Sequence, residues 1–258
     1  FAQNKGSGEL SIKATGKVTG GHYGGIFASN DGDGGLTIRV ADVSDGTYGI
    51  YAKNNGSGAL SIKASGTVTG TTAEGIDARN AGNGDLTISA TNVSGENKGI
   101  YVKNSSSDYS SRGSLLITAT GKVSGANADG IQVINNNYSD NMKVSGGTYG
   151  IRVSNNYGRT SLSITATGTV SGASADGISA RNAPGTDLTI SAKDVSGGRN
   201  GIYAAGANVT INAAAVSGGT NGIFAKSDHG TLSITATGLV EGKSGAGINA
   251  YGGFATSS

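Results

Sequence analysis

Residues 49–54 read Gly-Ile-Tyr-Ala-Lys-Asn, and the phrase Gly-Ile-x-Ala or Gly-Ile-x-Val that opens this stretch recurs along the chain. Its spacing is about 25 residues: 24 from Ile26 to Ile50 and 26 from Ile50 to Ile76. The isoleucines of the phrase are Ile26, Ile50, Ile76, Ile100, Ile131, Ile151, Ile178, Ile202, Ile223 and Ile248. A repeat of this length is typical of a solenoid, in which each repeat buries its apolar face against its neighbours.

Two further phrases precede the Gly-Ile phrase in each repeat. The first is Leu-Ser/Thr-Ile, at 10–12, 36–38, 60–62, 86–88, 162–164, 188–190 and 232–234, with variants at 115–117 and 209–211. The second is a valine followed in most cases by Ser or Thr, at Val18, Val43, Val68, Val93, Val123, Val144, Val170, Val195, Val216 and Val240. All three phrases alternate apolar with polar or small residues, which is the period of a β-strand. The pattern predicts an all-β fold, a parallel β-helix of about ten coils with three short strands in each.

The composition fits this fold and excludes several classes of function. The chain has 258 residues, 47 of them glycine, with one proline and no cysteine or tryptophan. We expect the glycines at turns that need a positive φ or a tight corner. Without cysteine there is no disulfide or thiolate metal site, and we expect no cofactor and no metal. A net charge of +2 is too small to indicate nucleic-acid binding, and the sequence contains no apolar run that would insert into a membrane.

The first residues resemble the end of a Gly-Ile phrase. Phe1-Ala2-Gln3-Asn4 matches residues 27–30, so we expect the chain to begin inside a coil. The prediction is a single β-helix domain over residues 1–258, cut from a longer protein, and a monomer.

The repeated phrases, with Ala-Thr-Gly-x-Val-Ser-Gly among them, resemble the passenger regions of Gram-negative autotransporters over nearly the whole chain. The resemblance implies a right-handed, single-stranded β-helix, carried across the outer membrane by a C-terminal barrel that this sequence lacks. It also implies a virulence factor that is secreted or displayed on the bacterial surface, because such passengers are mostly adhesins, toxins or proteases that act on host cells. The Ser-, Thr- and Asn-rich repeats are similar to those of secreted angiogenic factors that engage a host growth-factor receptor. An inert stalk is the remaining non-enzymatic alternative.

Stacking would turn each repeat position into a row along the rod. One such row is asparagine, which suits turns and can form amide bonds between coils: Asn30, Asn54, Asn80, Asn104, Asn135, Asn155 and Asn182. The outward residues of the Gly-Ile strands are aromatic and basic, the composition of many recognition surfaces. They include Tyr51, Lys53, Arg79, Tyr101, Lys103, Arg152, Arg181, Tyr203 and Lys226, with Phe27, Asp77 and Phe224 beside them. The alternative is that stacked rings only protect the sheet face.

A second basic row, Lys13, Arg39 and Lys63, lies on the Leu-Ser/Thr-Ile strands. Like charges at strand spacing repel unless an anion relieves them, so a sulfated glycosaminoglycan is a candidate ligand. Partial screening by Asp31, Asp33 or Asp85 is the alternative.

The repeat is irregular between Ile100 and Ile151. An insertion at 104–113 precedes a short coil in which residues 135–141 replace the usual Leu-Ser-Ile strand. Binding residues favour such loops, and Tyr109, Arg112 and Tyr138 are candidates, although drift in a tolerant turn explains the same facts.

An enzyme acting on polysaccharides is the last alternative, because many such enzymes are β-helices. Catalysis would need carboxylates within reach of one bond. Glu74, Asp129 and Asp176 share a row but fall in alternate coils, and Lys98 lies between the first two. We therefore expect no catalytic residues.

Overall fold

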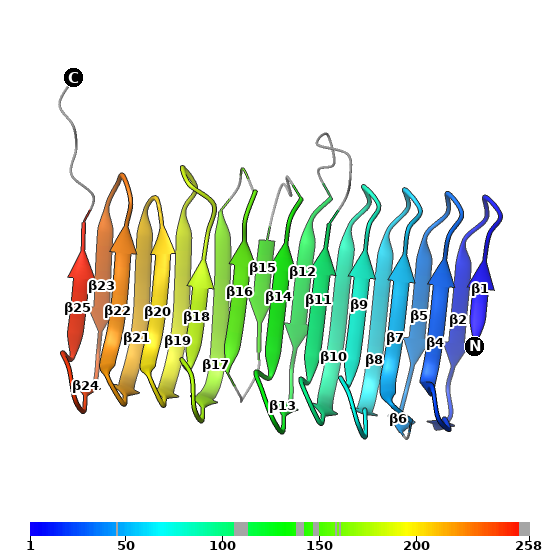
Figure 1. Ribbon diagram of the computed structural model, residues 1–258, viewed down its shortest axis with the longest axis horizontal. Coiled ribbons are helices and arrows are strands. Elements are labelled where there is room, and N and C mark those ends of the chain that lie inside the picture. Colours follow the sequence, from blue (N-terminus) through cyan, green and yellow to red (C-terminus); the bar gives the residue numbers. More distant parts are fainter. Residues whose placement is uncertain are drawn as a thin grey trace.

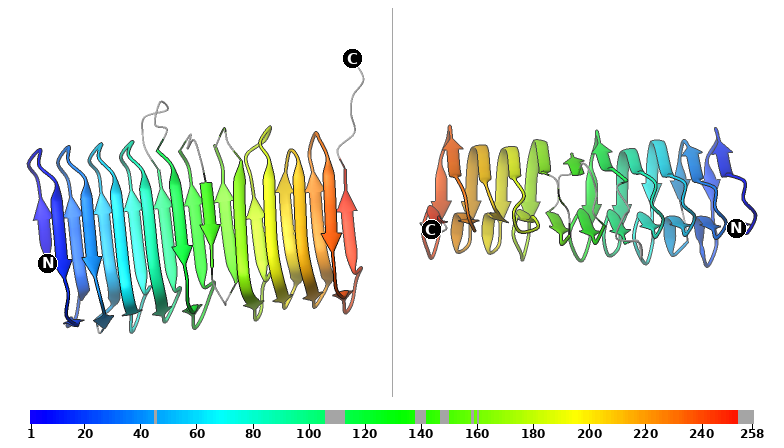
Figure 2. Two further views of the ribbon diagram at one scale, coloured as in Figure 1. Left: turned by 180° about the vertical axis from the view of Figure 1, so that it is seen from behind. Right: turned by 90° about the horizontal axis from the view of Figure 1, so that it is seen from above.

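The alternating phrases produce strands and no helices in the computed structural model, within residues 1–44, 46–105, 113–137, 142–146, 150–157, 159 and 161–252, which the structure describes. The strands are parallel and belong to two sheets. The chain winds between the sheets as a right-handed parallel β-helix of about nine turns, within one of the number expected from the repeats. Figures 1 and 2 show a straight rod whose coils follow one another in sequence order.

The Gly-Ile strands form the first sheet, which has eleven strands. Their bounds are β1 (Ala2–Asn4), β4 (Gly24–Asn30), β7 (Tyr48–Asn54), β9 (Ile76–Asn80), β11 (Ile100–Asn104), β14 (Ile131–Asn135), β16 (Ile151–Asn155), β18 (Ile178–Arg181), β20 (Asn200–Gly206), β22 (Asn221–Ser227) and β25 (Ile248–Tyr251).

The other two phrases share the second sheet, which has fourteen strands. Its main path is β2 (Leu10–Ala14), β5 (Leu36–Val40), β8 (Leu60–Thr69), β10 (Leu86–Gly95), β12 (Leu115–Ala119), β15 (Met142–Ser145), β17 (Leu162–Gly172), β19 (Leu188–Gly197), β21 (Val209–Gly218) and β23 (Leu232–Ala236). The separate valine strands are β3 (Val18–Thr19), β6 (Val43–Ser44), β13 (Val123–Gly125) and β24 (Val240–Gly242). In β8, β10, β17, β19 and β21 the two phrases join into one strand of 10 or 11 residues. A coil therefore has two or three strands, because the bend between the phrases is mild enough in these coils for pairing to continue.

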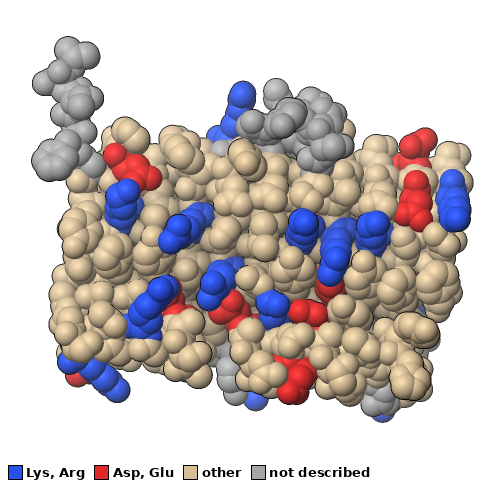
Figure 3. Space-filling view, in the orientation of Figure 1, with Lys and Arg blue, Asp and Glu red and all other residues tan. Residues whose placement is uncertain are grey.

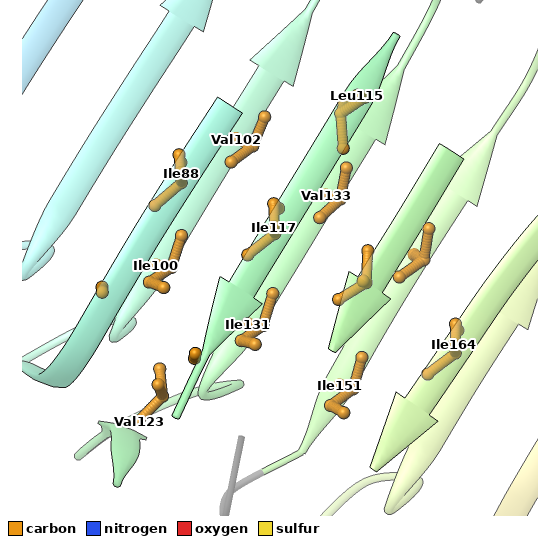
Figure 4. Close-up of a cluster of buried hydrophobic side chains, with 14 of the residues drawn as sticks. Ile88, Ile100, Val102, Leu115, Ile117, Val123, Ile131, Val133, Ile151 and Ile164 are labelled. Atoms are coloured by element: carbon orange, nitrogen blue, oxygen red, sulfur yellow. The ribbon is translucent and has the colours of Figure 1, made fainter. Parts of the chain in front are cut away.

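Equivalent residues of successive coils lie in register. Ile50 pairs with Ile26 on one side and Ile76 on the other, and Leu60 with Leu36 and Leu86. These aliphatic side chains form one continuous core between the sheets, and Ile100, Ile117 and Ile131 are fully buried (Figure 4). Because identical aliphatic residues stack on one another, small branched side chains are enough to fill the narrow interior.

The glycine of most Gly-Ile phrases has a packing role. A Cβ added to Gly75 would lie 2.5 Å from Cγ1 of Val93 and 2.8 Å from the carbonyl oxygen of Gly99 in the next coil. Among the described glycines only Gly24, Gly46, Gly146 and Gly185 have positive φ. Of the two roles expected for the glycines, positive φ therefore applies to four described positions, and many of the others lie where an added Cβ would meet neighbouring backbone atoms.

The short coil differs from its prediction. Met142 and Val144 lie in register with Leu115 and Ile117 on one side and with Leu162 and Ile164 on the other. Val144 thus occupies the isoleucine position of the Leu-Ser-Ile strand and does not belong to the valine series. Met142-Lys143-Val144 fits that strand because it also alternates apolar and polar residues. Residues 142–145 supply the strand that we expected to be replaced, and among the described residues this coil has no strand equivalent to β13.

Candidate binding surfaces

The predicted row of asparagines lies inside the turn that follows the first sheet. Asn30, Asn54, Asn80, Asn104, Asn135, Asn155 and Asn182 are all buried. Each side-chain amide donates to Oδ1 of the next asparagine, from Asn30 to Asn54 at 2.8 Å through Asn155 to Asn182 at 2.7 Å. Asn54 and Asn80 also donate to glycine carbonyls of their own turns. This asparagine ladder provides hydrogen bonds to carbonyl groups of the turns. Because its side-chain amides are all engaged in these bonds, they are not available to a ligand.

The aromatic rings on the outer face of the first sheet stack on one another. The centroids of Phe1 and Phe27 are 5.3 Å apart and those of Phe27 and Tyr51 are 4.5 Å apart, with nearly parallel planes. Tyr203 and Phe224 stack in the same way at 5.4 Å. Phe27 lies between the rings of Phe1 and Tyr51, so both of its faces are covered, whereas Phe1 at the end of the stack is 90% exposed. The rings inside the stack therefore do not offer flat platforms for a sugar or a base.

Asp77 lies in register between Tyr51 and Tyr101, where an aromatic residue would continue the stack. The guanidinium group of Arg79 contacts both tyrosine rings instead. The Asp77 side chain, which we expected to point outward, is 1% exposed and accepts two hydrogen bonds from Arg79, at 3.0 and 2.8 Å. The guanidinium group lies 5.4 Å from the ring centre of Tyr51 and 6.0 Å from that of Tyr101. Burial raises the pKa of Asp77, while the bonds from Arg79 oppose the rise. Arg79 therefore stabilises the first sheet by binding Asp77 of the same strand.

Most other cations on this face are also engaged. Ion pairs join Lys98 to Glu74 at 3.3 Å, Arg152 to Asp129 at 2.9 Å, Arg199 to Asp176 and Lys226 to Asp228 at 2.7 Å. Figure 3, in which this face is turned to the viewer, shows acidic groups beside many of the basic ones. Arg181 packs over the ring of Tyr203, with 5.1 Å from Cζ to the ring centre.

Lys53 and Lys103 flank Arg79 in register and form no ion pair among the described residues. Hydrogen bonds from Gln3 and Asn55, together with the nearby charge of Lys53, hold the pKa of Asp31 below its usual value. Lys53 is thus partly compensated, which weakens it as an anion-binding residue.

The buried acids of this face titrate differently. Burial raises the pKa of Asp129, against the opposing effect of Arg152. Burial also acts to raise the pKa of Asp176, but hydrogen bonds from Arg199 and from the backbone and side chain of Asn200 outweigh it and bring the pKa below its usual value. The pKa values of Asp129 and Asp176 shift in opposite directions because more hydrogen-bond donors reach the Asp176 carboxylate.

The basic row Lys13, Arg39 and Lys63 lies on the outer face of the second sheet. Lys13 pairs in register with Arg39, and Arg39 with Lys63, so the three side chains follow one another along the rod. All three are exposed, and among the described residues none forms an ion pair. The screening acids proposed from the sequence do not pair with them: Asp31 bonds to Gln3 and Asn55, and Asp85 accepts a bond from the backbone of Ser114.

A shallow groove of about 300 Å³ runs beside this row. The basic row borders it together with the small residues Ala14, Thr15, Val40, Ala41 and Ser65. The groove follows the bend where β2, β5 and β8 leave the Leu-Ser/Thr-Ile phrase. Three exposed cations that form no ion pair within the described part of the chain therefore line an open groove.

The irregular coils contain a cavity, but the candidate loop residues fall outside the part described. Tyr109, Arg112 and Tyr138 lie among the residues that the structure does not describe. The cavity has a volume of about 600 Å³ and opens beside the short coil, between β13 and the end of β17. Asp129 and Arg152 line it with serine and glycine residues. Their ion pair occupies the charged groups that a ligand would use.

The three acids that share a row in the sequence have separate ion-pair partners. Glu74, Asp129 and Asp176 each pair with a different cation. Within the described ranges no group of three or more His, Asp or Glu residues could hold a metal ion. The same part of the chain contains no helix that could span a membrane.

Two relationships were missed at the sequence level although a signal was present. Residues i and i+2 of a strand share a face, so Asp77 and Arg79 could have been recognised as a pair. Arg199 precedes Asn200, which lies one coil beyond Asp176, and the same register places both beside that carboxylate.

Comparison with known proteins does not extend this description. No protein family, curated protein or solved structure matches the chain.

Proposed function

We propose that this chain is a non-catalytic binding module of a secreted or surface-displayed bacterial virulence factor, and that it attaches to sulfated glycosaminoglycans on host cells. One observation carries the proposal: Lys13, Arg39 and Lys63 are exposed, lie in register and have no acidic partner among the described residues. The secreted location and the link to autotransporter passengers rest on the repeated phrases of the sequence.

The contrast with the first sheet supports this choice of surface. There, Arg79, Arg152 and Lys226 form ion pairs with Asp77, Asp129 and Asp228. An anion would have to displace those carboxylates, whereas no acid among the described residues pairs with the basic row. The separate pairing of Glu74, Asp129 and Asp176 likewise favours binding over hydrolysis.

A second candidate is a host growth-factor receptor, bound through the first sheet. Tyr51, Arg79 and Tyr101 form a rigid, partly exposed cluster, and Tyr and Arg are the residue types that dominate protein interfaces. This candidate makes a different prediction, since its affinity would depend on Tyr101 and Lys103 and not on the basic row.

The test is binding to immobilised heparin and to soluble heparin by calorimetry. The variant Lys13→Ala/Arg39→Ala/Lys63→Ala is compared with Lys5→Ala/Lys193→Ala/Lys243→Ala, which removes the same charge from exposed sites elsewhere. Each exposed ion pair contributes about 0.2–1 kcal/mol, so the first variant should lose about tenfold in affinity.

The control should bind nearly as well as the unmodified protein. Equal losses of heparin affinity in both variants would mean that binding depends only on net charge, and this would contradict the proposed site. Unchanged heparin binding together with loss of receptor binding in Tyr101→Ala/Lys103→Ala would favour the second candidate.

A further inference from the structure

The basic row has a direction as well as a charge. Lys13, Arg39 and Lys63 come from three successive strands, which lie about 4.8 Å apart, so the row extends about 10 Å along the rod. The groove beside it is lined by the same three coils. A ligand in this groove therefore meets one cation per coil.

Along a strand the charge pattern is different. The outward neighbours of Arg39 in its own coil are Thr37 and Ala41, and those of Lys63 are Ser61 and Ser65. A chain that crossed the rod at the coil of Arg39 or of Lys63 would meet a single cation flanked by uncharged residues. Only a chain that runs along the rod meets all three.

We propose that the ligand is a linear sulfated polysaccharide that lies parallel to the rod axis, with successive anionic groups bound by successive coils. The inference rests on the proposed function and adds to it an orientation and a length. The basic row and the groove beside it form the track that this ligand would follow. Ser89 follows Lys63 in register and Thr118 follows Ser89, so the cationic part of the track ends after three coils. The parallel row Ser11, Thr37, Ser61 and Thr87 provides hydroxyl groups for the sugar beside the cations.

A polysaccharide fits this track better than a nucleic acid. Single strands bind through bases that stack on aromatic side chains, and none of the residues lining this groove is aromatic. The stacked rings of Phe1, Phe27 and Tyr51 are on the other sheet.

The decisive experiment moves one charge without removing it. In Ser61→Lys/Lys63→Ser the cation shifts along β8 to the neighbouring outward row, so net charge, strand and coil are unchanged. If the ligand follows the row, affinity for a heparin hexasaccharide should fall about two- to fivefold, the range expected for losing one exposed ion pair. Thermal unfolding checks that the variant is folded.

A gain-of-function variant tests the same idea in the opposite direction. Ser89→Lys extends the row to four cations and should raise hexasaccharide affinity about two- to fivefold. Thr87→Lys adds the same charge to the same strand outside the row and should raise it less. The gain from Ser89→Lys should also be larger for an octasaccharide than for a tetrasaccharide, and a short DNA strand serves as the comparison polyanion.

The outcomes separate the two levels of the proposal. If the unmodified protein does not bind heparin, or if the triple variant binds like its control, the proposed function fails. If heparin binding depends on the basic row but the charge-shifted variant binds normally and Ser89→Lys equals Thr87→Lys, the function stands and the axial orientation is wrong. If the DNA strand binds more tightly than an octasaccharide, the ligand of the basic row is a nucleic acid and not a polysaccharide.

Discussion

Arg79 donates two hydrogen bonds, of 3.0 and 2.8 Å, to the carboxylate of Asp77, two residues earlier in the same strand. The pair fills a position that Tyr51 and Tyr101 occupy in the adjacent coils. A polar pair has thus been built into an aromatic column, and the column continues through the guanidinium group.

Arg79→Ala should destabilise the protein by about 2 kcal/mol, because it leaves a carboxylate that is 1% exposed without its partner. Arg79→Lys should recover only part of the loss, since lysine cannot form the two parallel bonds. Lys53→Ala is the matched control on the same face. Denaturant unfolding of Asp77→Ala, Arg79→Ala and the double variant measures the coupling, and strictly additive effects would show that the pair contributes nothing.

Gly75→Ala should destabilise by about 2 kcal/mol, because the new methyl group would overlap Val93 and backbone atoms of Ser94 and Gly99. Gly168→Ala is the control: its added Cβ meets nothing within 4 Å and its φ is not positive. The control should be neutral or stabilising by up to about 1 kcal/mol. Equal thermal midpoints for the two variants would refute the packing role of the Gly-Ile glycine.

Asn80→Ala should cost about 3 kcal/mol. It removes the acceptor of Asn54 and the donor to Asn104, all within the buried turn. Hydrogen exchange should show faster exchange in the coils on either side. Asn212→Ala, at an exposed position, should change stability by less than about 0.5 kcal/mol. A loss confined to the coil of Asn80 would argue against coupling along the ladder.

Asp176→Asn should lower stability at neutral pH by about 1–2 kcal/mol, because the carboxylate accepts bonds from Arg199 and Asn200. The pKa of Asp176 is lowered in the folded protein, so its contribution is present above the ordinary aspartate pKa and is lost as the pH falls through the lower folded value. Thermal midpoints of the two proteins should therefore converge below about pH 4. A difference that stays constant down to pH 2 would mean that ionisation of Asp176 is not involved.

The core could be predicted from the sequence because it stacks identical residues. Ile50 is buried against Ile26 and Ile76, and the repeat alone places the three in one column. Val144 shows the limit of this reasoning. A valine fits either inward phrase, and only its pairing with Ile117 and Ile164 identifies the strand to which it belongs.

The candidate surfaces were less predictable, because rows of outward residues do not reveal which partners the side chains choose. Arg79 and Lys63 occupy similar outward positions, yet Arg79 bonds to an acid of its own strand and Lys63 forms no ion pair among the described residues. That distinction depends on side-chain geometry in neighbouring coils. It decides which basic residues remain available to a ligand.

The asparagine ladder gives the rod a polarity. From Asn30 to Asn155 every side-chain amide donates toward the C-terminal coil and accepts from the N-terminal one, so the dipoles of the amide groups add along the axis. Reversing a single amide would set two donors against each other on one side and two acceptors on the other. The orientation is consequently shared by the whole chain of amides, and successive bonds polarise one another in the same sense.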